Sequence, residues 1–226
     1  MATTKRAENR AAMTARILEL GRRHLSTEGA AGLSLRAIAR DMGVVSSAVY
    51  RYVPSRDDLL TLLLVEAYTD LADAVDRAMT ADAPRERLQQ AALTMRRWAV
   101  DDPARWALLY GSPVPGYSAP AEQTVGPGTR VIGSLLRALD DAQRDGLLRP
   151  DLPHPDDPLV PELDAVATEF DLALPPAAIQ AATLLWASIV GGISLEVFGQ
   201  YGPDSFGHPE ALLRGQVDLV LAALFR

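Results

Sequence analysis

The sequence contains no cysteine, which excludes disulfide bonds and thiolate-bound metal sites. This absence fits a reducing compartment. The three histidines, His24, His154 and His208, are scattered along the chain and form no ligand cluster. Nucleophile-elbow, phosphate-loop and dinucleotide-binding motifs are also missing. We therefore expect no catalytic residues, no cofactor and no metal site, and the protein is not expected to be an enzyme.

Long apolar runs are lacking as well. No stretch of about 18 residues is both apolar and free of charge, as a membrane-spanning helix requires. The longest candidate, Ile179 to Gln200, is interrupted by Gly191, Gly192 and Glu196. The first ten residues are polar and charged, unlike the apolar segment of a secretory signal. We therefore expect no membrane contact and a cytoplasmic location.

The charge is unevenly distributed. Residues 1–56 hold ten Lys or Arg and four acids, a balance of +6, whereas the remainder holds twelve and twenty-five, a balance of −13. A basic head on an acidic body is typical of a DNA-binding module attached to a domain with another function. A charged, solvated helix surface would give the same pattern, so charge alone leaves both interpretations open.

The spacing of apolar residues is helical almost throughout, and no strand pattern is evident. The sequence therefore predicts an all-α fold. The expected helices are approximately Ala7–Glu28, Leu35–Met42, Ser46–Val53, Arg56–Asp82, Pro84–Val100, Pro103–Tyr110, Thr129–Gly146, a shorter helix ending near Phe170, Pro175–Tyr201 and Pro209–Arg226. Proline- and glycine-rich loops are expected over 111–128 and 150–161.

The segment SLRAIARDMGVVSSAVYRYVPSRDDL, residues 34–59, carries the functional signal. Two short helices joined at Gly43 cannot bury themselves, and their spacing suits a helix-turn-helix. If Tyr52 packs inward beside Val49, then Ser47, Tyr50 and Arg51 share the outward face. Hydroxyl, phenol and guanidinium groups on one face suit contacts to phosphates and base edges. An ordinary amphipathic surface helix is the alternative.

This segment resembles the DNA-binding domain of the tetracycline-repressor (TetR) family of regulators, over roughly residues 14–65. The matching residues are SLRAIARDMGV, AVYRYV and PSRDDLL. The resemblance implies an N-terminal three-helix DNA-binding domain over 1–56, and an effector-binding and dimerisation domain over 57–226. In the family, the third helix lies in the major groove.

The resemblance also assigns roles to individual residues. Base contacts are implied for the start of the third helix, phosphate contacts for its aromatic residues, and phosphate binding for the start of the fourth helix. The implied DNA-binding residues are Ser34, Arg36, Ser46, Ser47, Ala48, Tyr50, Arg51, Tyr52 and Arg56.

Three positions depart from the family pattern. Val45 stands where a capping Ser, Thr or Asp is usual, so we expect Ser46 to cap the third helix instead. Ala48 replaces a common Ser or Thr, and Arg56 replaces the more usual Lys. These departures affect sequence preference rather than DNA binding itself.

The C-terminal part resembles the effector-binding domain of the same family, in a subgroup with a Trp-His-Gly-like motif. The corresponding stretch is WASIVGGISLEVFG, residues 186–199, with Val190 where the histidine is expected. The resemblance implies a homodimer formed through the last two helices. A small apolar effector is expected against an aromatic lining. The candidate residues are Trp98, Trp106, Tyr110, Tyr117, Phe170 and Trp186, each of which equally suits plain core packing.

These expectations combine into a sequence-specific regulator of transcription that binds double-stranded DNA, with repression released by the effector. Activation is a second possibility. A different class of protein, a helical small-molecule binder without a DNA function, is the alternative. The operator, the effector and the regulated genes do not follow from the sequence.

Overall fold

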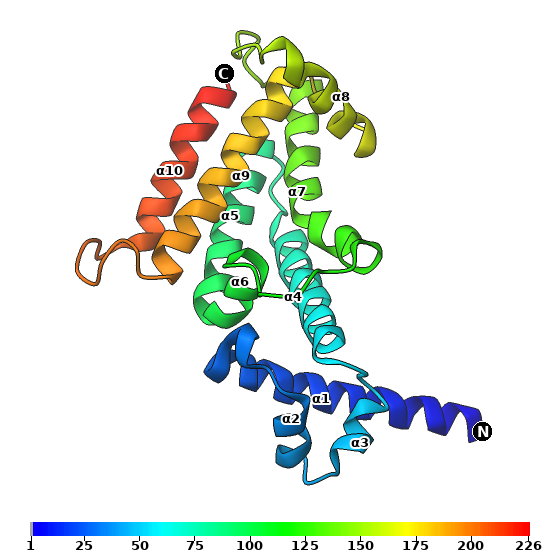
Figure 1. The fold of residues 1–226 in the computed structure, drawn as a ribbon. Helices are drawn as coiled ribbons and strands as arrows, with labels where there is room; N and C mark the ends of the chain where they lie inside the picture. The colour runs from blue at the N-terminus through cyan, green and yellow to red at the C-terminus, as the bar shows by residue number, and fades with distance from the viewer. Residues whose placement is uncertain (1) are drawn as a thin grey trace. The chain divides into compact units, whose positions relative to one another are not determined.

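The computed structural model describes residues 2–226, apart from the side chains of residues 2, 3, 4 and 6. Within these residues the fold is helical, with one isolated antiparallel bridge between Leu148 and Phe225 (Figure 1). The predicted all-α class is confirmed. The elements are α1 (Ala2–Gly32), α2 (Leu35–Asp41), α3 (Ser46–Tyr50), α4 (Arg56–Ala78), α5 (Pro84–Asp101), α6 (Pro103–Tyr110), α7 (Ala121–Arg144), the 3-10 turn η1 (Asp157–Leu159), α8 (Val160–Glu169), α9 (Pro176–Val197) and α10 (Pro209–Leu224).

The chain divides into two compact units. The first holds the residues up to Thr69 together with Asp102–Gly128, and the second holds Asp70–Asp101 with Thr129–Arg226. The predicted boundary after Arg56 lies inside the first unit. Compactness does not show which residues bind DNA or an effector, so this functional division stays a prediction.

The first unit is built around one face of α1. Ile17, Leu20 and Leu25 are buried in a core with apolar residues of α2, α3 and α4, as the helical spacing predicts. At Gly21 a Cβ atom would lie 3.3 Å from methyl groups of Leu59 and Leu63, so glycine permits α1 and α4 to approach closely. The core that supports the short helices α2 and α3 is therefore supplied largely by α1 and α4.

Polar contacts also join elements within the first unit. Arg22 Nη1 donates to both carboxylate oxygens of Glu66 at 2.7 and 2.8 Å, which links α1 to α4. Helix α6 contacts α1, and its residues Ala104 and Leu108 pack on the same core as the helix-turn-helix. A segment from beyond residue 100 is thus part of the unit that contains α2 and α3.

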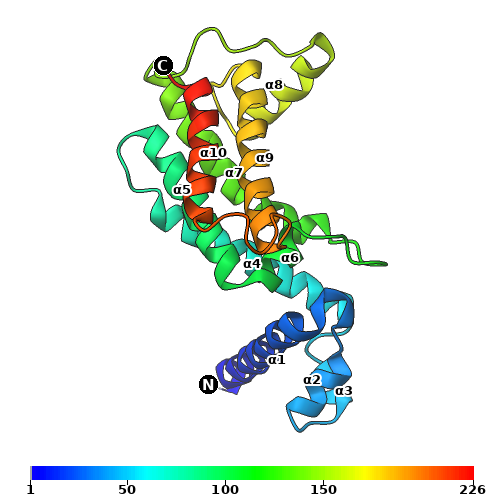
Figure 2. The same ribbon diagram turned by 90° about the vertical axis from the view of Figure 1, so that its left-hand side faces the viewer.

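In the second unit, α5, α9 and α10 pack against one another (Figure 2). Arg96 of α5 donates to both oxygens of Glu196 in α9 at 2.8 and 2.6 Å, and both side chains are mostly buried. Helix α9 has the length and composition of a membrane span, with a mean hydropathy of 1.6. Its contacts with α5, α8 and α10 are those of an apolar helix inside a bundle.

Several predicted helix ends were wrong, for local reasons. Helix α4 ends at Ala78 rather than Asp82, because the Gln90 side chain accepts hydrogen bonds from the N–H groups of Thr80 and Ala81. These bonds stabilise a turn where the helix was expected to continue. The predicted end of the first helix at Glu28 is confirmed, because the backbone of α1 is non-helical at Gly29 (φ 68°, ψ 174°) before it continues to Gly32.

Helix α7 begins at Ala121, eight residues before the predicted start. Its sequence there includes Gly126, Pro127 and Gly128, which predicted a loop. The helix starts because Pro120 offers its carbonyl to the N–H groups of Gln123 and Thr124, at 3.1 Å each. Pro127 then costs one backbone hydrogen bond without ending the helix.

Candidate nucleic-acid interface

Helix α2 and the turn after it are set by three residues. The Ser34 hydroxyl accepts a hydrogen bond from the N–H of Ala37 at 3.4 Å, which confirms the predicted N-cap. Gly43 has a φ of 68°, the left-handed conformation that favours glycine. The chain then turns back so that the N–H of Val44 bonds the Ala39 carbonyl at 3.0 Å. The small buried Ala39 accommodates this return.

Helix α3 is a short helix with an uncapped start. Val45 is the N-cap residue and makes no side-chain capping bond, so the expectation that Ser46 caps the helix was wrong. The backbone of Val45 is extended (φ −68°, ψ 142°), which makes Ser46 already the first helical residue. The helix ends at Tyr50 instead of Val53, because the N–H groups of Tyr52 and Val53 share the Val49 carbonyl in a turn that leads to proline.

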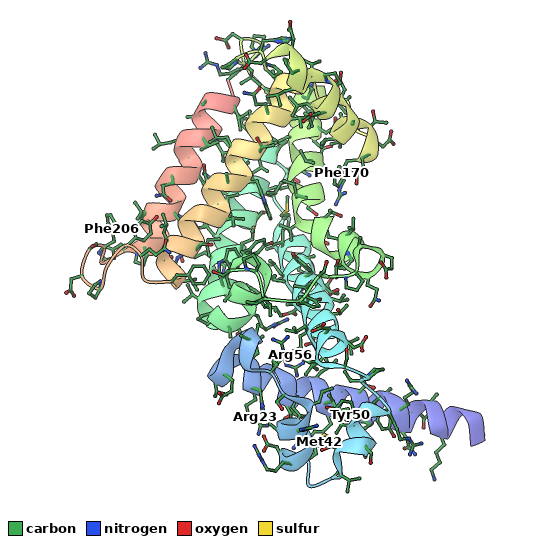
Figure 3. All side chains as sticks on the ribbon, viewed as in Figure 1. Arg23, Met42, Tyr50, Arg56, Phe170 and Phe206 are labelled. Carbon is green, nitrogen blue, oxygen red and sulfur yellow. The ribbon has the colours of Figure 1, made fainter. Side chains whose placement is uncertain are left out.

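The outward face of α3 is as predicted. Val49 is buried and Tyr52 packs partly against the core, whereas Ser47 and Arg51 are exposed. Tyr50 is 40% exposed (Figure 3). This face, formed by Ser47, Tyr50 and Arg51, is called the reading face below. A hydroxyl, a phenol and a guanidinium are therefore open to a ligand on one side of a short, well-supported helix.

Tyr52 has a partner that the sequence did not reveal. The guanidinium carbon of Arg10 lies 5.8 Å from the centre of the Tyr52 ring, a cation–π distance. The two residues are 42 positions apart, and their contact brings the N-terminal part of α1 beside the segment that follows α3. Only the packing of α1 could reveal this proximity.

The remaining predicted DNA-binding residues have different environments. Arg36 is exposed, and Ser34, Ser46 and Ala48 are half-buried. Arg56 is already engaged: its Nη2 donates to the carbonyl oxygens of Ala30 and Ala31 at 2.9 and 3.2 Å. These bonds hold the start of α4 against the end of α1, so Arg56 has a structural role whether or not it also contacts phosphate.

A contact between a histidine and a carboxylate joins α1 to α2. His24 Nε2 lies 2.7 Å from Asp41 Oδ2, and the hydrogen bond from His24 lowers the pKa of the Asp41 carboxyl. His24 is thus a satisfied histidine on the inner stripe of α1. In the described part of the chain, no cluster of three or more His, Asp or Glu residues could hold a metal ion.

Three of the six aromatic effector candidates lie in the first unit. Trp106 is fully buried, and its ring centre is 4.4 Å from that of Tyr110. The Tyr117 hydroxyl lies 2.9 Å from the Thr61 hydroxyl, which ties the loop after α6 to α4. Tyr68 of α4, which the sequence did not single out, belongs with this group. Burial raises the pKa of both Tyr68 and Tyr110. The Tyr117 phenol raises the pKa of Tyr68 further, and the Tyr68 phenol does the same for Tyr110, so both groups stay neutral.

The other three candidates, Trp98, Phe170 and Trp186, lie in the second unit. Trp98 Nε1 donates to Asp70 at 3.0 Å, and Trp186 is half-buried in α9. Phe170 lines a cleft of about 570 Å³ that is otherwise rich in arginine and aspartate. A cleft lined mainly by charged groups does not suit a small apolar effector. The six candidates are therefore divided between two units.

Comparison with known proteins identifies the family. The model of bacterial regulatory proteins of the tetR family matches residues 17–63, and that of the tetracyclin repressor-like C-terminal domain matches residues 88–220. This chain belongs to the TetR family of bacterial transcriptional regulators. It is 50% identical to the HTH-type transcriptional regulator Rv1816 of Mycobacterium tuberculosis, over 97% of this chain and 95% of the relative. Regulators of this TetR type are DNA-binding proteins and not enzymes.

Two solved structures share the fold of this chain. A regulatory protein named SCO4313 is 30% identical, with a TM-score of 0.79 over 96% of this chain and 98% of the other. The complex of SmeT with triclosan shares the fold at 17% identity, with a TM-score of 0.66 over 95% and 92% of the two chains. The fold described above is therefore shared with these structures, and the helix-turn-helix lies within residues 17–63, which the tetR-family model matches.

Proposed function

We propose that this TetR-family regulator is a homodimeric repressor, which a small, largely apolar effector releases from double-stranded DNA. The observation that carries the proposal is the exposed reading face of Ser47, Tyr50 and Arg51 on a short helix backed by a buried core. Base contacts are assigned to Arg36, Ser47 and the start of α3, and phosphate contacts to Tyr50 and Arg51.

The dimer is proposed to form through α9 and α10. Leu184 is 58% exposed and Leu219 is 75% exposed, so both helices leave an apolar side chain open to a partner. A groove of about 490 Å³, lined mostly by apolar residues, runs between these helices. It contains Gln180 Oε1, which is buried yet accepts no hydrogen bond from residues 2–226. A second copy would cover the leucines and offer a donor to this oxygen.

A two-fold axis would place two reading faces on successive major grooves, about 34–36 Å apart. In this arrangement residues 1–56 read DNA, and residues 57–226 sense the effector and dimerise. A regulator that acts on bacterial DNA works in the cytoplasm. The alternative of a small-molecule binder without a DNA function is not favoured, since the relatives named above are transcriptional regulators.

The effector is proposed to act through the aromatic group of Trp106, Tyr110 and Tyr117. Tyr117 packs on the helix-turn-helix core and contacts Thr61 of α4. An effector that displaces Tyr117 would therefore alter the packing of the core that positions α3. The triclosan complex of SmeT is a precedent for an aromatic ligand in this fold. A coupling of about 1–3 kcal/mol between the two sites would be typical.

Binding to genomic fragments selected by the wild-type protein tests the proposal. We expect Arg51→Gln to weaken binding and to make the dependence of log K on log salt shallower, by about 0.9 for each phosphate that the variant no longer neutralises. Arg77→Gln removes the same charge from an exposed position in the second unit and should leave binding unchanged. Equal binding by wild type and Arg51→Gln at every salt concentration contradicts the proposal.

A further inference from the structure

We infer that the first turns of α1, residues 2–12, form a second DNA-contacting element that binds phosphates flanking the sequence read by α3. This inference rests on the proposed function and adds a contact region outside the helix-turn-helix. The segment is called the N-terminal extension below.

The N-terminal extension has no place in the core of the first unit. Every described side chain from Lys5 to Ala12 is exposed, and packing on the core begins at Met13. Figure 1 shows this end of α1 continuing past α3 to a free end. At 1.5 Å per residue, eleven helical residues reach about 16 Å. The extension is therefore long enough to follow the backbone of a bound duplex beyond the reading face.

The charge of the extension is complementary to DNA. Its sequence carries Lys5, Arg6 and Arg10 against the single acid Glu8. The Lys5 side chain is exposed, and Arg10 has the Tyr52 ring as its neighbour. Apart from alanine, no apolar side chain lies between Lys5 and Ala12, so an apolar partner has nothing to bind. A polyanion is the partner that this composition suits.

The position of the extension points to the same duplex that α3 reads. Arg10 stacks over Tyr52, two residues after Tyr50 of the reading face. An exposed helix of about three turns is marginally stable in water, even when it is rich in alanine. Contacts to phosphates on the flank of the operator would provide the stabilisation that the core of the first unit does not.

The experiment measures the salt dependence of binding to two forms of a DNA fragment selected by the wild type. The short form ends at the outermost base pairs that a variant without residues 2–12 protects in footprinting, and the long form extends about 10 bp beyond them, one helical turn. On the long form, Lys5→Gln is expected to make the slope of log K against log salt concentration shallower by about 0.9 per protomer. Shortening the flanks is expected to weaken binding of the wild type but not of Lys5→Gln. Because the Lys5 side chain is exposed and packing on the core begins only at Met13, the substitution is expected to leave the fold intact.

Two controls separate the possible outcomes. Lys5→Arg keeps the charge and should behave as the wild type, and Arg77→Gln should respond to flank length as the wild type does. The inference is overturned if Lys5→Gln keeps the wild-type slope and flank dependence. If Arg51→Gln still weakens binding in that case, the proposed function stands without the extension. If the wild type binds no DNA, both proposals fail.

Discussion

Near α2 and α3, some charged residues make hydrogen bonds within the first unit, whereas others are exposed. Arg56 bonds the carbonyl groups that end α1, and His24 pairs with Asp41, whereas Arg36 and Arg51 are exposed. The engaged groups fix the positions of α2 and α4 against α1. The free cations near the reading face keep their hydrogen-bonding capacity for an external anion, as a DNA-binding surface requires.

The Asp41–His24 pair gives a pH-dependent contribution to stability. Since the folded-state pKa of Asp41 lies below its unfolded value of about 3.9, the contribution is present above about pH 4 and is lost as the pH falls through the folded-state pKa. Asp41→Asn should therefore lower the thermal unfolding midpoint at neutral pH, and the difference from wild type should shrink at about pH 3. Asp82→Asn, at an exposed turn, is the control. A difference that stays constant with pH would contradict this assignment.

At the scale of elements, α3 is the weakest helix by its own composition. It has five residues, no side-chain cap at Val45 and a proline four residues after its end. Its conformation depends on Val49, which anchors it in the core, and on the turn at Gly43. Because packing holds this short helix in place, the outward side chains of α3 need not stabilise the helix. They can therefore contact DNA.

The uncapped start of α3 predicts a stabilising substitution. Val45 is 71% exposed and extended, so Val45→Ser removes little buried area and can cap the free N–H groups of the first turn. We expect unfolding in urea to require about 0.5–2 kcal/mol more than for Val45→Ala, the matched variant without a hydroxyl. If serine and alanine give equal stabilities, the extended backbone at Val45 does not act as an N-cap.

At the scale of the whole molecule, basic and acidic residues are segregated along the chain. The basic balance lies in residues 1–56, and the acidic balance in the remainder reduces contact between DNA and other surfaces. The exposed leucines of α9 and α10 lie in the acidic part, away in sequence from the reading face. This distribution allows one region to bind a polyanion while another binds a second copy of the chain.

The dimer predicts the effect of a charge on α9. Leu184→Glu should shift the protein to a monomer in sedimentation velocity, because a buried carboxylate without a partner is costly at an interface. DNA affinity should fall as well, since one protomer reads one half-site. Leu159→Glu, at a similarly exposed leucine in the η1 turn, should leave the dimer intact. A dimeric Leu184→Glu protein would place the interface elsewhere.

The local sequence predicted much of the helix-turn-helix formed by α2 and α3. Ser34 predicted the cap of α2, Gly43 the turn, and the spacing of Val49 and Tyr52 predicted which side of α3 faces outward. These features depend on side chains and backbone within one or two turns. For the same reason the sequence alone determined the all-α class and the approximate position of most helices.

Tertiary structure decided the features that join distant residues. The bonds from Arg56 to α1 and the contact of Arg10 with Tyr52 have no local signature. The same holds for the division of the aromatic candidates, since Trp106 and Phe170 differ in environment although both fit an apolar pattern. Helical periodicity shows which face of a helix is apolar, but the partner of that face depends on how the helices pack.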